Sequence, residues 1–187
     1  MRLARRFAGP FGVIAVAAAA VVVAHSVGLR LNLTPSLPRG VYMLRSGVPT
    51  RGARVAACLP TEAASLGRER GYLGKGTCAS RSAPVLKFVA ATAGDVVAVG
   101  ADITVNGKHL QPAPPLEDRA GRLLAIFPAG RYELASDELW LYSASLHSWD
   151  SRFFGPVPVE NVLGVVRPLW TWGPAETFPR ESPERRP

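Results

Sequence analysis

Two side chains of this sequence have the types that could form a nucleophile and its base. Ser36 stands in the turn-forming stretch TPSLPRG, and Lys87 stands in the apolar run VLKFVAATA. Burial can shift the pKa of a lysine down by about 3–5 units, so that the amine becomes neutral near pH 7. A neutral amine can take the proton of a serine hydroxyl, which is the Ser-Lys form of nucleophilic catalysis. The pair therefore predicts a Ser-Lys site.

A structural role for Lys87 is the alternative. A lysine on an edge strand can pack its aliphatic stem and place its charge in water. For an arbitrary strand this structural role is the better expectation. The composition nevertheless makes the chemical role worth examining, since only three of the 22 Lys and Arg residues are lysines, at positions 75, 87 and 108. Arginine cannot become neutral near pH 7, so each remaining lysine is a candidate for a task that arginine cannot perform.

A Ser-His-Asp triad is the rival chemistry, because His147, Ser148 and Asp150 nearly adjoin. Adjacent residues of an extended segment point to opposite faces, and triads are assembled from distant parts of a chain. The spacing therefore disfavours a triad, and we expect His147 to be a surface or packing residue.

Charge and composition exclude other classes of function. The formal net charge is +8, but the arginines are dispersed rather than clustered on one stretch, which disfavours a nucleic-acid partner. Two cysteines 20 residues apart and three scattered histidines match no metal-ligand spacing. We expect neither a metal nor another cofactor.

The elements that must position these residues begin with an apolar N-terminal segment. Arg2, Arg5 and Arg6 precede an uncharged run of 18 residues, Phe7–Ala24, and 23 residues if it is extended to Leu29. This length can span a bilayer, and the basic flank places the N-terminus in the cytoplasm. We expect a cytoplasmic segment 1–6 and a transmembrane anchor 7–29. A cleaved signal peptide is the alternative, and both readings export the rest of the chain.

An exported domain over 30–172 and a polar tail over 173–187 are expected to follow. Cys58 and Cys78 suit an oxidising compartment, where they would form a disulfide, although two unpaired buried thiols are the alternative. A short helix is expected between them, capped by Thr61 and ended by Gly71. The Asn-Gly pair at 106–107 predicts a two-residue hairpin turn.

The rest of the exported part reads as a mainly β fold with antiparallel pairing. Gly, Pro or Asp residues bound short β-rich runs, which is typical of strands. The expected strands are Val41–Arg45, Arg54–Leu59, Val85–Ala91, Val96–Val99, Ile103–Val105, Leu123–Phe127, Glu138–Tyr142 and Val162–Val166.

Three boxes, in order behind a single anchor, resemble the signal peptidase I family of membrane-anchored Ser-Lys peptidases. PSLPRGVY is similar to the nucleophile box, LKFVAATAGDVV to the lysine box, and SWDSRFFGPVP to the distal box. The paired cysteines around a short helix are similar to the TraF-type branch, which acts in conjugative transfer. The resemblance implies an antiparallel β signal-peptidase-like catalytic domain on one transmembrane helix.

The resemblance implies a role for each matching residue. Ser36 would be the nucleophile and Lys87 the general base. The Thr34 hydroxyl and the backbone N–H of Ser36 would form the oxyanion hole, and Ser148 would orient the lysine.

The resemblance gives Asp150 and Arg152 a supporting role beside the site. The sequence departs from the family pattern in two places. Residues 141–145 read LYSAS where the family has Gly-Asp-Asn-Arg, and Phe88 follows the lysine where a basic residue is common. These departures concern the wall of the site and leave the Ser-Lys pair intact.

The implied function is cleavage of exported preproteins at the periplasmic face of a bacterial inner membrane. The implied substrate is a conjugative pilin, with type IV secretion machinery as partner. The acyl-enzyme is resolved either by water or by an amine that closes the product head to tail. The alternative is a non-catalytic, membrane-tethered β module of a secretion or pilus assembly complex.

Overall fold

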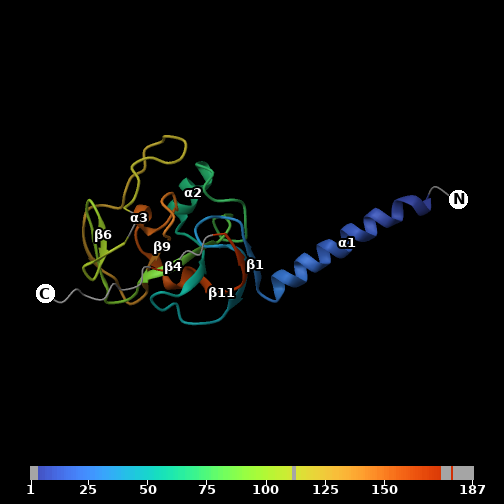
Figure 1. The fold of residues 1–187 in the computed structure, drawn as a ribbon, viewed down its shortest axis with the longest axis horizontal. Coiled ribbons are helices and arrows are strands. Elements are labelled where there is room, and N and C mark those ends of the chain that lie inside the picture. Colours follow the sequence, from blue (N-terminus) through green and yellow to red (C-terminus); the bar gives the residue numbers. More distant parts are fainter. Residues whose placement is uncertain (1–3, 111–112, 174–177, 179–187) are drawn as a thin grey trace.

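The computed structural model describes residues 4–110, 113–173 and 178. A long helix, α1 (Ala4–Ser26), extends away from a β-rich body (Figure 1). Among the described residues, no helix combines the length and the apolar character needed to cross a membrane. Most of the expected polar tail, 173–187, lies outside the described residues.

The body contains two antiparallel sheets, so the mainly β, antiparallel prediction is confirmed. The larger sheet has the spatial order β1 (Leu29–Asn32), β2 (Arg39–Arg45), β11 (Val162–Trp172), β3 (Arg54–Ala57), β4 (Val85–Ala91), β9 (Glu138–Tyr142) and β10 (Val157–Pro158). The smaller sheet has the order β7 (Lys108–His109), β6 (Ile103–Val105), β5 (Val96–Val99) and β8 (Gly130–Glu133). The body also holds α2 (Thr61–Glu69), α3 (Ser151–Phe154) and a 3₁₀ turn, Val159–Asn161.

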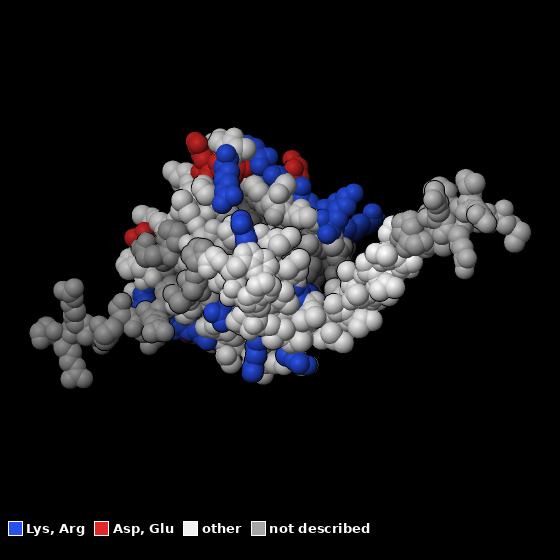
Figure 2. All heavy atoms as spheres, turned by 45° about the vertical axis from the view of Figure 1, so that its right-hand side comes forward, with Lys and Arg blue, Asp and Glu red and all other residues white. Residues whose placement is uncertain are grey.

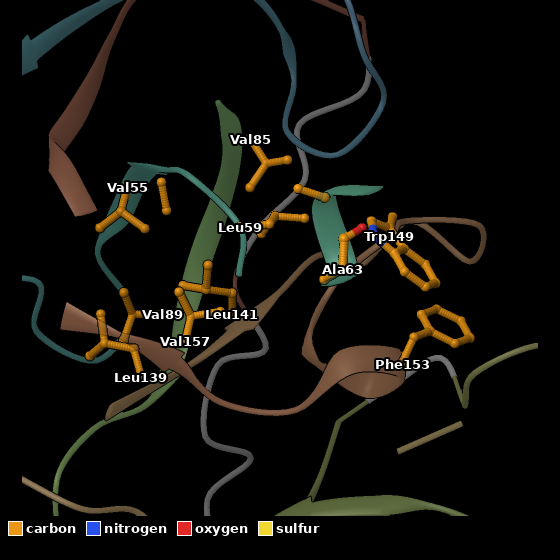
Figure 3. Packing of buried hydrophobic residues seen from close by; sticks show 12 residues of the cluster. Val55, Leu59, Ala63, Val85, Val89, Leu139, Leu141, Trp149, Phe153 and Val157 are labelled. Carbon is orange, nitrogen blue, oxygen red and sulfur yellow. Dashed lines mark hydrogen bonds between the residues drawn. The ribbon is translucent and has the colours of Figure 1, made fainter. Parts of the chain in front are cut away.

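Strand β4 lies inside the larger sheet, and all seven of its residues are buried. Alternation sends Val85 and Val89 into the cluster that α2 and α3 cover, and Figure 3 shows Val85 near Leu59 and Val89 near Leu141. Leu86 and Phe88 enter a separate cluster on the opposite face. Lys87 therefore stands in a strand that is covered on both faces, which corrects the edge-strand alternative.

The disulfide prediction is confirmed, since Cys58 and Cys78 are bonded with a Cα–Cα distance of 5.6 Å. The bond closes an excursion that contains α2. Trp149 Nε1 donates to the carbonyl of Ala63 in α2 at 3.0 Å, so the excursion also packs against the segment that precedes α3. Figure 3 shows Trp149 beside Ala63, with Phe153 close by.

Two local predictions were wrong. Residues 123–127 form only an isolated bridge, Glu117 with Leu123, because their backbone bonds go to a loop and to α3: Leu124 N–H donates to the Leu116 carbonyl, and Phe127 N–H to that of Arg152. The helix α2 has Pro60 as its N-cap, with no side-chain cap, so Thr61 is its first helical residue rather than its cap.

The turn predictions were better. Asn106 and Gly107 both have positive φ, 50° and 78°, and join β6 to β7 as expected for this hairpin turn. Gly71, with φ 76°, follows the end of α2. The strands β1, β8 and β10 were not predicted.

Candidate active site

The Ser36 loop joins β1 to β2 and is fixed on the C-terminal side of Ser36. Leu37 is fully buried in the cluster that holds Phe88, and the Tyr42 hydroxyl donates to the Pro38 carbonyl at 2.6 Å. Ser36, just before them, remains partly exposed. Proline on both sides of the Ser36–Leu37 pair restricts the backbone, so the turn presents the hydroxyl in a defined direction.

The Lys87 amine meets two serine hydroxyls. Its Nζ donates to Ser36 Oγ at 2.6 Å and to Ser148 Oγ at 2.5 Å, and the two hydroxyl oxygens are 3.3 Å apart. Lys87 is 2% exposed and Ser148 4%. Residues separated by 51 and 61 positions in the chain thus form one compact triangle of polar atoms.

The loop that carries Ser148 is held by a buried ion pair. Arg152 Nε donates to one Asp150 carboxylate oxygen at 2.8 Å, and its Nη2 to the other at 2.8 Å, with both residues fully buried. Arg152 Nη2 also donates to the carbonyls of Ser143 and Ser145, and Ser148 N–H donates to Ser145. Asp150 and Arg152 therefore shape the loop under Ser148.

The same geometry disfavours the Ser-His-Asp triad. Both carboxylate oxygens of Asp150 are bound to Arg152, and one of them also accepts the Ser143 N–H at 3.2 Å. His147 is exposed. The hydroxyl of Ser148 is bound to Lys87 instead.

Thr34 lies two residues before Ser36 and lines the same cavity. Its hydroxyl donates to Asn32 Oδ1 at 2.8 Å, and its backbone N–H donates to the same oxygen at 3.2 Å. To serve an oxyanion, the Thr34 hydroxyl would have to turn its proton away from Asn32. The oxyanion role of Thr34 stays a prediction.

Sequence reasoning missed Asn32. This side chain is 3% exposed, and its Nδ2 contacts the carbonyls of Thr34, Leu37 and Pro38 at 3.0–3.2 Å. A buried asparagine that binds three carbonyls of one loop fixes the shape of that loop. The only signal in the sequence is an asparagine between two leucines at the end of a short apolar run.

A cavity of about 700 Å³ contains the three polar groups and extends along the protein. Its lining includes Leu31–Ser36, the start of β4, and the chain that follows α2. Sequence reasoning also missed a second group of residues in this lining, namely Tyr72, Asp118 and Arg122. The Tyr72 hydroxyl and Arg122 Nε both donate to Asp118 Oδ2, the latter at 2.7 Å.

These contacts lower the pKa of Asp118, chiefly through the Tyr72 hydrogen bond and further through those of Arg122 and Ala120, against the opposing effect of burial. The hydrogen bond to Asp118 raises the pKa of Arg122. The carboxylate therefore stays ionised at neutral pH. It links the chain after α2 to the loop before Leu124.

The described residues include no group of three or more His, Cys, Asp or Glu that could hold a metal ion. The chemistry that the cavity offers is that of a buried amine in hydrogen-bond contact with a partly exposed hydroxyl. This arrangement suits removal of the hydroxyl proton during attack on a carbonyl group.

Comparison with known proteins agrees with this geometry. The family model described as "Signal peptidase, peptidase S26" matches residues 3–172. The plasmid transfer protein TraF of Escherichia coli is 36% identical over 182 residues, which cover 91% of this chain and 99% of that protein. The probable conjugal transfer protein TraF of Sinorhizobium fredii is 37% identical over 150 residues, 79% of each chain.

The conjugal transfer protein TraF of Agrobacterium tumefaciens is 35% identical over 150 residues, which cover 79% of this chain and 85% of that protein. The family match spans the Ser36 loop, β4 and the Ser148 loop and covers most of the chain. The chain belongs to the S26 family of signal peptidases, in its TraF-type branch.

Proposed function

We propose that the protein is a serine endopeptidase that uses Ser36 as nucleophile and Lys87 as general base. The observation that carries the proposal is the position of one buried amine within 2.6 Å of the Ser36 hydroxyl. Burial disfavours the charged ammonium, and the neutral amine accepts the hydroxyl proton. Ser148 would hold Nζ in place through its own hydroxyl.

The reaction would proceed by acyl transfer. Ser36 Oγ bonds to the scissile carbonyl carbon while its proton moves to Lys87 Nζ. The tetrahedral intermediate collapses, the C–N bond breaks, and the ammonium of Lys87 returns the proton to the leaving amine. A second nucleophile then attacks the acyl-enzyme, with Lys87 again accepting its proton. Water as that nucleophile gives hydrolysis, and the amino terminus of the same substrate gives head-to-tail closure.

The oxyanion of the tetrahedral intermediate needs hydrogen-bond donors. The backbone N–H of Ser36 and the Thr34 hydroxyl are the proposed donors, and each such donor is typically worth about 3 kcal/mol. Thr34 is exposed and lies in the cavity lining, so a substrate carbonyl could reach it.

The family and the names of the relatives support the proposed substrate class. Signal peptidases act on exported preproteins, and the relatives are named for plasmid or conjugal transfer. We propose that this chain matures a pilin subunit of a conjugative, type IV secretion apparatus at the periplasmic face of the inner membrane.

A membrane tether is part of this proposal. The run Phe7–Ala24 is uncharged, and the described side chains from Gly12 to Ser26 are nearly all exposed, with valines uncovered on every side of α1. The described part of α1 presents apolar side chains on every side, and such a surface is stabilised by an apolar environment. Figure 1 shows that the body does not provide it, because α1 points away. We assign that environment to the bilayer.

A labelling experiment tests the nucleophile. The full-length protein in detergent is treated with a β-lactam-type acylating inhibitor and examined by intact mass and peptide mapping. The proposal predicts one adduct, on Ser36, which is absent in Ser36→Ala and Lys87→Ala. Ser80→Ala, on the disulfide-bonded excursion, is the control and should label normally. Absence of an adduct on wild-type Ser36, or labelling elsewhere, would favour the non-catalytic module.

A further inference from the structure

The cavity that holds Ser36 and Lys87 is also lined by three arginines, Arg70, Arg119 and Arg122. They come from two segments that the chain separates, the end of α2 and the loop before Leu124. Figure 2 shows basic and acidic side chains gathered at the top of the molecule. Figure 1 places α2 and the loop 113–124, drawn in yellow, at this end. Asp118 is the one acid among the lining residues, so the balance of charge there depends on how Asp118 is used.

Asp118 is fully committed within the protein. Its Oδ2 accepts the Tyr72 hydroxyl and Arg122 Nε, and its Oδ1 accepts the backbone N–H groups of Ala120 and Arg122 at 2.8 and 3.0 Å. The side chain is 9% exposed. Arg122 Nη2 also donates to the Arg70 carbonyl, which keeps the pair fixed against the end of α2. Asp118 therefore neutralises Arg122 and no other arginine.

Arg70 and Arg119 have N–H groups that are available to a ligand. Arg70 Nη1 donates to the Leu123 carbonyl at 2.7 Å, which uses one of its five N–H groups. Arg119 is exposed and makes no hydrogen bond or ion pair with the described residues. The nearby acids Glu69 and Glu117 are exposed and are not part of the cavity lining. The lining thus carries two positive charges that the described protein does not neutralise.

The part of the cavity lining that carries Arg70 and Arg119 is joined to the candidate active site by aromatic packing. The ring of Tyr72 lies 5.4 Å from that of Trp149, which directly follows Ser148. Trp149 itself lines the cavity between the two regions. A peptide bound with its scissile bond at Ser36 could therefore extend along Trp149 and Tyr72 to reach Arg70 and Arg119.

We propose that Arg70 and Arg119 bind a carboxylate of the peptide substrate and so select substrates with negative charge close to the scissile bond. This inference rests on the proposed peptidase function and adds a specificity element to it. Guanidinium groups match carboxylates in shape and donor geometry, and Arg119 is free to move toward one. Two sources supply that chemistry: an Asp or Glu side chain, or the carboxyl terminus of a substrate cut near its end.

The test uses full-length protein in detergent and a set of peptides with small residues before the scissile bond. Glu or Gln is placed in turn at each of four positions on either side of that bond, in peptides with a free or an amidated carboxyl terminus. The comparison of kcat/KM should show one position, or the free terminus, at which the carboxylate is preferred about three- to fivefold, as for exposed ion pairs. Added salt should reduce that preference.

Two charge reversals complete the test. Arg119→Glu should abolish or invert the preference, measured as the ratio of kcat/KM for the Glu peptide to that for the Gln peptide. Arg131→Glu, the same change on the exposed strand β8 of the smaller sheet, should leave it intact. If wild type cleaves neutral and acidic peptides equally well at every position, or if Arg119→Glu keeps the preference, the inference is wrong and the peptidase function stands. If wild type cleaves none of the peptides, the proposed function itself fails, and the inference with it.

Discussion

Asn32 makes five hydrogen-bond contacts, and all of them fall within the segment 34–38 that carries Ser36. Its side-chain NH₂ group contacts three buried or half-buried carbonyls of this segment, and its side-chain oxygen accepts hydrogen bonds from the N–H and hydroxyl of Thr34. We interpret Asn32 as a positioning residue for the nucleophile. It does not touch the reacting atoms, so it acts through the shape of the loop.

Replacing Asn32 tests that interpretation. Asn32→Ala removes these contacts, each worth about 1 kcal/mol net, and should lower the free energy of unfolding by about 2–4 kcal/mol. Among the molecules that remain folded, kcat should fall about 10- to 100-fold because the nucleophile is displaced. Thermal melts and active-site titration separate the two effects.

Asn106→Ala is the matched control, because Asn106 also makes side-chain hydrogen bonds but belongs to the hairpin of the smaller sheet. It should cost stability without lowering kcat per folded molecule. Equal kcat values for Asn32→Ala and wild type would show that Asn32 stabilises the fold without positioning the nucleophile.

At the scale of elements, the excursion closed by Cys58–Cys78 carries one wall of the cavity. A loop of 20 residues should stabilise the fold by about 3 kcal/mol in the chain-entropy account. The double variant Cys58→Ser, Cys78→Ser should lose about that much in denaturant unfolding. Its KM should rise more than its kcat falls, because the chain after α2 lines the cavity while the Ser-Lys pair lies on other elements. A purely kcat effect would contradict this division.

The Tyr72–Asp118–Arg122 contacts join the chain after α2 to the 113–124 loop, and they predict a pH dependence. The pKa of Asp118 is lowered on folding from its ordinary value of 3.8. Its contribution to stability is therefore present above about pH 4 and is lost as the pH falls toward the folded-state pKa. Asp118→Asn should melt at a lower temperature than wild type at pH 7, and the difference should shrink below pH 4. A difference that is the same at both pH values would rule out the ionised carboxylate as its cause.

Sequence reasoning was most successful for elements whose signals are local. Asn106-Gly107 specifies its turn by backbone preference alone, and the apolar run of β4 marks a buried strand. The run Leu123–Phe127 carried a similar apolar signal, but its backbone bonds to a loop and to α3, and no local pattern encodes these partners.

The residues of the candidate site also separate into those that the sequence indicated and those that it did not. The residue types of Ser36 and Lys87 indicated the chemistry, and the family resemblance indicated that Ser148 would join them. Contacts between distant segments were not predictable from one sequence, as in the case of Tyr72 and Asp118, which are 46 positions apart. Asn32 was missed because its role depends on how the following loop closes over it.

At the scale of the whole molecule, the four tryptophans separate into two pairs. Trp140 and Trp149 are buried, whereas Trp170 is 70% exposed and its ring contacts that of Trp172. The exposed pair lies at the end of β11, next to β2, which pairs with β1 just after α1. Amphipathic rings are favoured at the headgroup level of a bilayer, so we expect this pair to rest there.

Brominated lipids test this placement in the full-length protein reconstituted into vesicles. Quenching of tryptophan fluorescence should be substantial in wild type and largely lost in Trp170→Phe, Trp172→Phe, while the buried pair continues to emit. Quenching that survives the double substitution would place the membrane contact elsewhere.

The central claim is that the neutral amine of Lys87 takes the proton of Ser36, and Lys87→Arg tests it most directly. Arginine keeps the charge and much of the stem but cannot accept a proton near neutral pH. Cleavage of a preprotein peptide is measured across pH for wild type, Lys87→Arg, Ser36→Ala and the double variant, with a thermal melt of each.

The account predicts that wild-type activity rises with pH as the amine loses its proton. It predicts that both single variants are inactive, and that the double variant is no worse than either, because the two residues act as one unit. Substantial cleavage by folded Lys87→Arg would contradict the Ser-Lys mechanism.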